Sequence, residues 1–188
     1  METFKTWFEE VQLDGHMKEA RAMALATLSP EGHLHNRIVL LKEITDEGLV
    51  FYTNYESSKG KDLKAHPTCE VVFYWDHIGK QVRISGKVEK TSREVSEAYW
   101  NTRPKESQFS QYISKQSEPI KDRLSLEERV EQVRNKFKDE PVPLPSHWGG
   151  YLIRPNKVEL WIGHPSRLHD RYLFTKKGGS WTSGRLYP

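Results

Sequence analysis

The chain has 188 residues, with 29 Lys and Arg against 26 Asp and Glu and a formal net charge of +3. Its single cysteine, Cys69, excludes an internal disulfide and a zinc site built on paired cysteines. No apolar run is long enough to cross a membrane, and the small, dispersed positive charge does not favour nucleic acid as a partner. The acidic N-terminus does not resemble a signal peptide, so we expect a cytoplasmic protein. The length predicts one domain over residues 1–188.

Residues 1–90 predict a helical segment followed by strands. An apolar face with helical spacing passes through Phe4, Trp7, Phe8 and Val11. A second helical stretch is expected over His16–Arg21, so that residues 1–21 form an N-terminal helical segment. The expected strands are Ala22–Leu28, His35–Ile44, Leu49–Asn54, Glu70–Trp75 and Gln81–Lys90. A short basic helix is expected over Ser57–His66, with Ser57 or Ser58 as its N-cap.

The rest of the chain predicts helices and then a closing set of strands. The expected helices are Arg93–Thr102, Ser107–Ser114 and Ser125–Lys138, the last with a capping-box pattern that begins at Ser125. The proline-rich stretch Pro141–Pro145 predicts an extended linker. Residues 143–188 then supply the strands Gly150–Arg154, Lys157–Ile162, Arg167–Thr175 and Ser180–Leu186, with a hairpin turn at Lys177-Gly178-Gly179. This order predicts an α+β fold with a mostly antiparallel barrel and helices outside it, and it argues against a Rossmann fold.

Common cofactor and nucleophile motifs are absent. The chain has no dinucleotide-binding glycine loop, no P-loop, no HExxH and no GxSxG. The histidines are scattered, and His33 and His35 on a predicted turn are more simply explained as solvent-facing residues than as metal ligands. We therefore predict no metal site and look instead for places where cations converge.

The segment Arg167-Leu168-His169-Asp170-Arg171 is the first such place. If it is a strand, alternation puts Arg167, His169 and Arg171 on one face. Three adjacent cations repel one another unless an anion lies among them, and the guanidinium fork suits phosphate. A solvated strand face with carboxylate partners explains the pattern equally well.

Two other segments carry cations near hydroxyls or apolar strands. Tyr99, Arg103 and Ser107 are spaced by four, which aligns them on a helix, although Pro104 interrupts that helix. A phosphate grip is one interpretation, and a helix end with an ordinary arginine is favoured by spacing alone. Arg37 and Lys42 flank an apolar strand, and strict alternation puts them on opposite faces. They can serve one ligand only at a bulge or a strand end.

Taken together, these segments resemble the pyridoxamine 5′-phosphate oxidase family. The resemblance runs in order from about Ala22 to Pro188. It includes RIVLLK at Arg37–Lys42, FYTN at Phe51–Asn54, KQVRISGKVEK at Lys80–Lys90, YWNTRPKESQ at Tyr99–Gln108, SKQS at Ser114–Ser117, PLPSHWGGY at Pro143–Tyr151, ELWIGHPSRLHDR at Glu159–Arg171 and the terminal RLYP. The combination of RPKES, the tryptophan-glycine-glycine segment and RLHDR makes the resemblance specific.

The resemblance implies an FMN-binding split β-barrel that works as a homodimer, with FMN in clefts between the subunits. It implies an oxidase that converts pyridoxine 5′-phosphate and pyridoxamine 5′-phosphate to pyridoxal 5′-phosphate. A hydride would pass from C4′ of the substrate to flavin N5, and O2 would reoxidise the flavin with release of H2O2. The amine substrate would also release ammonia.

The resemblance also implies roles for individual residues. The implied FMN contacts are Arg37, Ile38, Val39, Leu40, Leu41, Lys42, Tyr52, Thr53, Ser58, Lys59, Gln81, Gln116, Ser117, Trp161 and Arg171. The substrate phosphate would be held by Lys42, Tyr99, Arg103 and Ser107. Arg167 and His169 would lie over the substrate ring and are the catalytic candidates. Two positions depart from the family pattern, Ser58 where Arg is usual and Ile162 where Gln is usual.

Two other functions stay open from the sequence. Flavin oxidases of phenazine pathways share the implied fold and cofactor but act on a different ring system. A flavin- or pyridoxal-phosphate-binding protein without turnover is the second alternative, because a fold does not decide a function.

Overall fold

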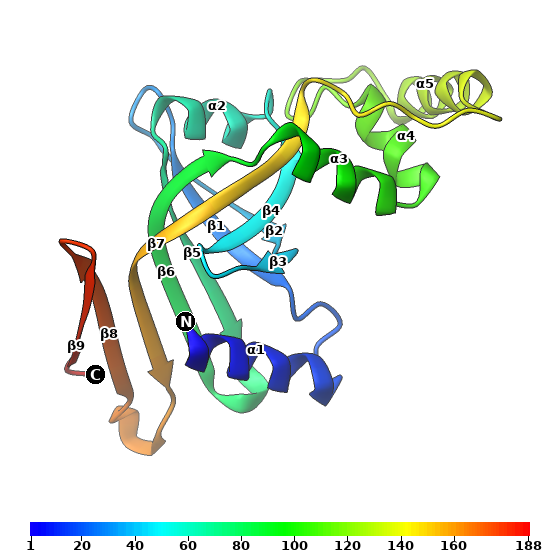
Figure 1. Cartoon of the computed structure of the whole chain (residues 1–188). Coiled ribbons are helices and arrows are strands. Elements are labelled where there is room, and N and C mark those ends of the chain that lie inside the picture. Colours follow the sequence, from blue (N-terminus) through cyan, green and yellow to red (C-terminus); the bar gives the residue numbers. More distant parts are fainter.

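A nine-stranded antiparallel sheet, curled into a half-barrel, forms the centre of the computed structural model, which describes residues 1–188 (Figure 1). The strands are β1 Ala22–Leu28, β2 Leu34–Leu40, β3 Glu43–Ile44, β4 Leu49–Asn54, β5 Thr68–Trp75, β6 Lys80–Lys90, β7 Trp148–Ile162, β8 Asp170–Lys177 and β9 Ser180–Arg185. The helices are α1 Glu2–Asp14, α2 Ser58–Ala65, α3 Arg93–Thr102, α4 Lys105–Ile113 and α5 Arg123–Lys136, with short 3-10 turns η1 Asp76–Ile78 and η2 Pro165–Arg167. The predicted α+β class and the split barrel are confirmed. None of the helices is long and apolar enough to span a membrane.

The long strand β7 splits the barrel. The sheet runs in the order β2-β1-β5-β6-β7-β4-β3, and β8 and β9 continue from β7 outside this path. The first part of β7 pairs with β4 and its last part pairs with β8, while β6 pairs along nearly all of it. The sequence predicted two strands here, because Pro155 and Asn156 interrupt the pattern. A register shift beside Gly86 keeps β7 continuous, and a Cβ at Gly86 would lie 2.3 Å from the Arg154 carbonyl oxygen.

The helix α1 closes the barrel core as its apolar spacing predicted. Phe4, Trp7, Phe8 and Val11 are all buried, and the Phe4 ring lies 5.1 Å from the ring of Phe73 on β5. The helix ends at Gly15, which has a left-handed φ of 69°. The predicted second helix over His16–Arg21 is therefore wrong, and this stretch is a turn before β1.

A second apolar cluster lies under α3, α4 and α5. It contains Trp100, Phe109, Val133, Phe137, Val142, Leu144 and Trp148. The Trp100 indole donates to the Val142 carbonyl oxygen at 2.8 Å, which ties the predicted proline-rich linker to α3. The predicted capping box at Ser125 is wrong, because Asp122 caps α5 and accepts from the Ser125 amide at 2.7 Å.

Two predicted strands start or end more than two residues from the expected position. His35–Ile44 is divided, since β2 ends at Leu40 and only Glu43–Ile44 pairs again. The strand expected over Arg167–Thr175 begins only at Asp170, because Ser166 and Arg167 have positive φ values of 59° and 62°. The inference that alternation places Arg167, His169 and Arg171 on one strand face is therefore wrong.

Candidate functional site

A cavity of about 640 Å³ opens between β2, β4 and the junction of α3 with α4. Its volume lies within the range of about 300–1,000 Å³ that is usual for small-molecule and cofactor sites. From the predicted site residues it collects Arg37, Ile38, Val39, Leu40, Lys42, Tyr52, Thr53, Lys59, Tyr99, Arg103, Ser107 and Gln116. Segments up to 79 positions apart in the sequence, from Arg37 to Gln116, therefore meet in one cavity.

Strand and helix ends bring the cations of this cavity together. Arg37 and Lys42 both line it because β2 ends at Leu40, so strict alternation does not extend to Lys42. On the other side of the cavity, α3 ends at Thr102, two residues before Pro104. Pro104 is the N-cap of the next helix, α4. Tyr99, Arg103 and Ser107 still line the same cavity, although no single helix aligns them.

An aromatic stack supports Arg103. The Tyr52 and Tyr99 rings lie 3.9 Å apart at 15°, and Trp148 stacks on Tyr52 at 5.5 Å. The Arg103 guanidinium carbon lies 5.1 Å from the Trp148 ring centroid, and its buried Nε has no hydrogen-bond partner. Burial raises the pKa of Tyr52 to about 12, so this phenol stays neutral at physiological pH. Arg103 thus lines the cavity with its side chain supported by aromatic rings.

Lys59 and Gln116 form a second polar group in the cavity. The Lys59 ammonium donates to Gln116 Oε1 at 2.9 Å and to Ser57 Oγ at 3.3 Å, and the Thr53 hydroxyl also donates to Gln116 Oε1 at 3.3 Å. Burial, and next the charge of Arg37, lower the pKa of Lys59 to about 8. Because Lys59 is buried, the loss of water around its ammonium group costs free energy. An anion bound next to it would offset this cost.

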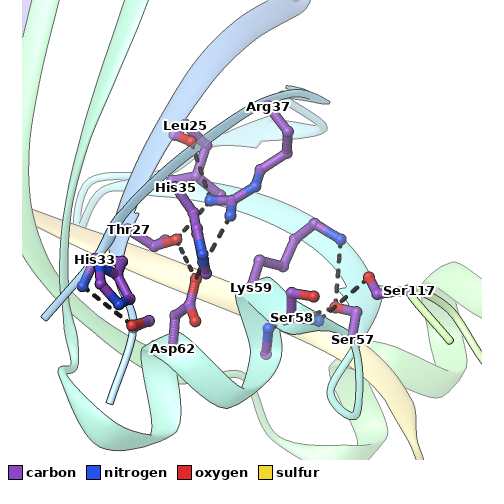
Figure 2. A network of polar contacts seen from close by, with 12 residues as sticks. Leu25, Thr27, His33, His35, Arg37, Ser57, Ser58, Lys59, Asp62 and Ser117 are labelled. Carbon is purple, nitrogen blue, oxygen red and sulfur yellow. Dashed lines mark hydrogen bonds and ion pairs between the residues drawn. The ribbon is translucent and has the colours of Figure 1, made fainter. Parts of the chain in front are cut away.

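A neighbouring hollow of about 540 Å³ shares Arg37, Lys59 and Gln116 with the cavity and is also lined by Ser58 and Ser117. It lies at the start of α2, where Ser57 is the N-cap and the Ser58 amide donates to Ser117 Oγ at 3.2 Å (Figure 2). Ser117 has a positive φ of 75°, which is uncommon for a residue other than glycine. The two hollows form one polar, cation-lined surface, and a helix N-terminus adds backbone N–H groups to it.

The remaining predicted residues lie elsewhere in this chain. Gln81, Trp161 and Arg171 stand directly opposite one another on β6, β7 and β8. The Arg171 Nε donates at 2.9 Å to Glu159, a carboxylate that is only 5 % exposed. None of the three lines the cavity, and β8 and η2 lie at the far end of the molecule from α3 and α4 (Figure 1). Leu41 is buried in the barrel core and does not line the cavity either.

Arg167 and His169 join this second group beside β8. The His169 ring lies 4.6 Å from the Trp161 ring, and its Nδ1 accepts the backbone N–H of His164 at 3.1 Å. His164 in turn pairs through Nε2 with Asp170 at 2.8 Å. Arg167 follows Ser166 in the left-handed backbone turn of η2, a strained conformation of the kind found at functional sites. The structure thus sorts the predicted site residues into a cavity set and a set around Trp161, which we call the β8 set.

Sequence reasoning missed several residues of the cavity. Thr102, Pro104 and Gln111 line it, and His35 and Asn36 line the neighbouring hollow. It also missed Thr27 and Asp62, which hydrogen-bond to the guanidinium of Arg37. For His35 the alternation of β2 could have given a signal, since His35 and Arg37 share a face. No local sequence pattern indicates Thr27 or Asp62, because the two residues that hydrogen-bond to each other lie 35 positions apart.

Comparison with known proteins gives consistent results. Residues 11–137 match the family model described as pyridoxamine 5′-phosphate oxidase, and residues 148–188 match the pyridoxine 5′-phosphate oxidase C-terminal dimerisation region. The chain is 46% identical to a pyridoxine/pyridoxamine 5′-phosphate oxidase of Leptospira interrogans, over 98% of this chain and 86% of that protein. It is 45% identical to the protein of that name from Burkholderia lata, over 98% and 87% of the two chains.

A solved structure is also similar. The crystal structure of PhzG from Burkholderia lata 383, in complex with tetrahydrophenazine-1-carboxylic acid, superposes with a TM-score of 0.93 and 26% identity. The match covers 99% of this chain and 91% of that one. The fold and the order of the elements are therefore shared across proteins that carry different names.

Proposed function

This chain belongs to the pyridoxamine 5′-phosphate oxidase family, and on that premise we propose that it oxidises pyridoxine 5′-phosphate and pyridoxamine 5′-phosphate to pyridoxal 5′-phosphate. We propose FMN as the cofactor and O2 as the electron acceptor. The family and the general oxidase activity rest on the named relatives, whereas the reaction, the cofactor and the site residues are proposals that the geometry supports.

One observation carries the proposal: a single cavity is lined by two separately built groups of cations. Arg37 and Lys59 come from β2 and α2, and Lys42 and Arg103 come from the chain beyond β2 and the end of α3. Asp62 pairs with Arg37 at 3.5 Å, but Lys42, Lys59 and Arg103 have no ion-pair partner. These cations repel one another unless anions bind among them. A cofactor phosphate and a substrate phosphate together supply that charge, which a single small anion does not.

The residues present fit FMN. Arg37, Lys59 and the amide groups at the start of α2 make a donor set for a phosphate monoester, and the polar side chains of Thr53 and Gln116 adjoin it. Within the cavity set, Ile38, Val39 and Leu40 would lie along the cofactor and Tyr52 would add a neutral hydroxyl. When bound, FMN would supply the hydride acceptor for the reaction and its reoxidation by O2.

The substrate phosphate is assigned to Lys42, Tyr99, Arg103 and Ser107. The place of Arg103 on the cavity wall is the strongest support, since a guanidinium offers several N–H donors to a phosphate. The Arg103 guanidinium lies over the Trp148 ring, which itself stacks on Tyr52, and this contact stabilises its position. These residues would fix the phosphate end of the substrate, so that its reacting carbon is held in one place.

The hydrogen bond from the His164 amide supports a role for His169. An imidazole that accepts at Nδ1 and is neutral carries its proton on Nε2. His169 would then present an N–H donor to the substrate, which supports a role in orienting the substrate rather than in taking a proton from it. Arg167 would supply positive charge beside it. Both residues are candidates for positioning the substrate over the cofactor.

The separation of the two sets supports a homodimer. Gln81, Trp161 and Arg171 lie on the sheet face opposite to the core residues Val82 and Leu160, and none of the three lines the cavity of its own chain. We propose that the β8 set of one subunit completes the cavity of its partner, with FMN at the interface. The match of residues 148–188 to a dimerisation region supports this arrangement.

A phenazine-type oxidase is the second candidate, and the likeness to PhzG favours it. The identities support the vitamin substrate instead. Of the two Burkholderia lata proteins, the chain is 45% identical to the pyridoxine/pyridoxamine 5′-phosphate oxidase and 26% identical to PhzG. The second phosphate grip around Arg103 also supports it, because tetrahydrophenazine-1-carboxylic acid, the compound named in the PhzG complex, has no phosphate.

Anaerobic titration of the FMN-loaded protein tests this proposal. We expect pyridoxine 5′-phosphate and pyridoxamine 5′-phosphate to bleach the visible flavin band, and admission of air to restore it with formation of the aldehyde. Bleaching only by a reduced tricyclic compound would instead support the phenazine-type activity. A bound flavin that no substrate reduces would leave a binding protein without turnover.

A further inference from the structure

Asp62 is a buried carboxylate next to a cavity that we propose binds anions. It lies on the inner face of α2, one turn after Lys59, and is only 2 % exposed. Arg37 and Lys59 line the cation-rich cavity next to it. A negative charge here opposes the binding of a phosphate, and burying it costs free energy. Its presence needs a reason that outweighs both effects.

The contacts of Asp62 give that reason. Its Oδ2 accepts the Thr27 hydroxyl at 2.6 Å, lies 3.0 Å from His35 Nδ1 and lies 3.5 Å from Arg37 Nη2 (Figure 2). Thr27 also accepts Arg37 Nη1 at 2.5 Å, and the same Nη1 donates to the Leu25 carbonyl oxygen at 3.1 Å. Arg37 is thus held by Asp62, by Thr27 and by the backbone of β1.

Asp62 also balances the charge of the two cations. Burial raises the pKa of the Asp62 carboxyl, whereas the hydrogen bonds from Thr27 and His35 lower it. The net result is a pKa below the usual value. The carboxylate is therefore ionised at neutral pH. Its charge works against the burial and the Arg37 repulsion that lower the pKa of Lys59. Without Asp62, Lys59 would lose its proton more easily.

We propose that Asp62, together with Thr27, is a positioning residue that aims the Arg37 guanidinium at the cofactor phosphate. The inference rests on the proposed FMN function. It assigns to a buried anion a favourable role in binding another anion. It acts through Arg37 and makes no contact with the cofactor itself.

The sign of one substitution separates this role from simple electrostatics. If Asp62 is only a nearby negative charge, Asp62→Asn removes repulsion and FMN binds more tightly. If Asp62 positions Arg37, the same substitution releases the guanidinium and weakens binding by about tenfold, the size of one charge-assisted hydrogen bond. Riboflavin, which lacks the phosphate, should bind equally well to both proteins.

The experiment titrates the cofactor-free full chain with FMN and with riboflavin and follows flavin fluorescence. The variants are Asp62→Asn, Thr27→Val and Arg37→Met. The matched control for loss of one negative charge is Glu56→Gln, at an exposed residue just before α2. We expect weaker FMN binding for Asp62→Asn and Thr27→Val, unchanged riboflavin binding, and no loss in Glu56→Gln. In the Arg37→Met background, Asp62→Asn should lose most of its effect on FMN, because the two residues act together.

Unchanged or tighter FMN binding in Asp62→Asn contradicts the proposal, as does an equal loss for FMN and riboflavin. If Asp62→Asn does not fold, Thr27→Val decides by the same two criteria, since the threonine hydroxyl joins the carboxylate to the guanidinium. Failure of the unaltered protein to bind FMN would instead count against the proposed cofactor. The two ideas therefore fail in different ways.

Discussion

At the scale of single residues, Arg103 is the clearest test of the substrate assignment. Arg103→Ala removes a half-buried guanidinium and its contact with Trp148. We expect the KM for pyridoxine 5′-phosphate to rise about 100-fold, as for loss of a charge-assisted phosphate contact, with FMN affinity unchanged. Arg103→Lys keeps the charge but loses the planar fork, so it should recover only part of the loss. Steady-state kinetics and a flavin titration measure the two quantities, and a loss of FMN with an unchanged KM would reverse the assignment.

Lys59 makes FMN affinity depend on pH. Its pKa in the folded protein is lowered to about 8, so its ammonium is charged below that pH and neutral above it. The phosphate needs the charged form, so affinity should be fully present below about pH 7 and fall as the pH rises through 8. One proton is involved, so the fall is at most about tenfold per pH unit. Titrations with FMN from about pH 6 to about pH 9.5, on both sides of this pKa, should show the fall in affinity. Lys59→Met should abolish this dependence on pH. If affinity falls in parallel in the two proteins, Lys59 does not cause the dependence.

The cavity residues differ in how far the sequence could predict them. Tyr99, Arg103 and Ser107 were predicted by spacing and resemblance, and all three line one cavity. The predicted interruption at Pro104 is confirmed, and in the structure the three residues meet across this helix break rather than on one straight helix face. Thr27 and Asp62 could not be predicted, since only the packing of α2 on β1 makes a carboxylate meet a threonine 35 positions away.

At the scale of elements, α1 is a part of the barrel core that the sequence predicted well. Phe4 is 1 % exposed and contacts Phe8, Phe73 and Trp75. Phe4→Ala should lower the free energy of unfolding by about 3–5 kcal/mol, as for other large-to-small changes in a core. Gln12→Ala on the exposed face of the same helix is the control and should change it by less than about 0.5 kcal/mol. Urea denaturation measures both, and equal effects would mean that α1 does not pack as described.

Elements were predicted where local patterns agree with packing and missed where backbone geometry decides. The helix α3 begins and ends where predicted, and β1 and β4 do too. The segment after α1 reads as helical, but Gly15 ends the helix in a left-handed turn. The RLHDR segment reads as a strand, but positive φ values at Ser166 and Arg167 start the strand three residues later. Such values at residues other than glycine have no local sequence signal.

At the scale of the whole molecule, no pattern in the sequence indicates directly that the site divides between two parts of the chain. The resemblance implied a dimer with FMN between subunits, and the structure adds that the cavity set and the β8 set do not meet within one chain. Pairing of two copies is the arrangement that would bring them together. The central claim is therefore that each site takes its cavity from one subunit and its β8 set from the other.

Complementation between two inactive variants tests this claim most directly. Arg103→Ala impairs the cavity set and Arg167→Ala impairs the β8 set, so each homodimer should have little activity. After unfolding and refolding together, half of the dimers should be mixed. Each mixed dimer holds one site with both arginines, so oxidase activity should return to roughly a quarter of that of the unaltered protein. If the whole site lies within one chain, every site in the mixture carries one defect, and no activity above that of the separate variants will appear.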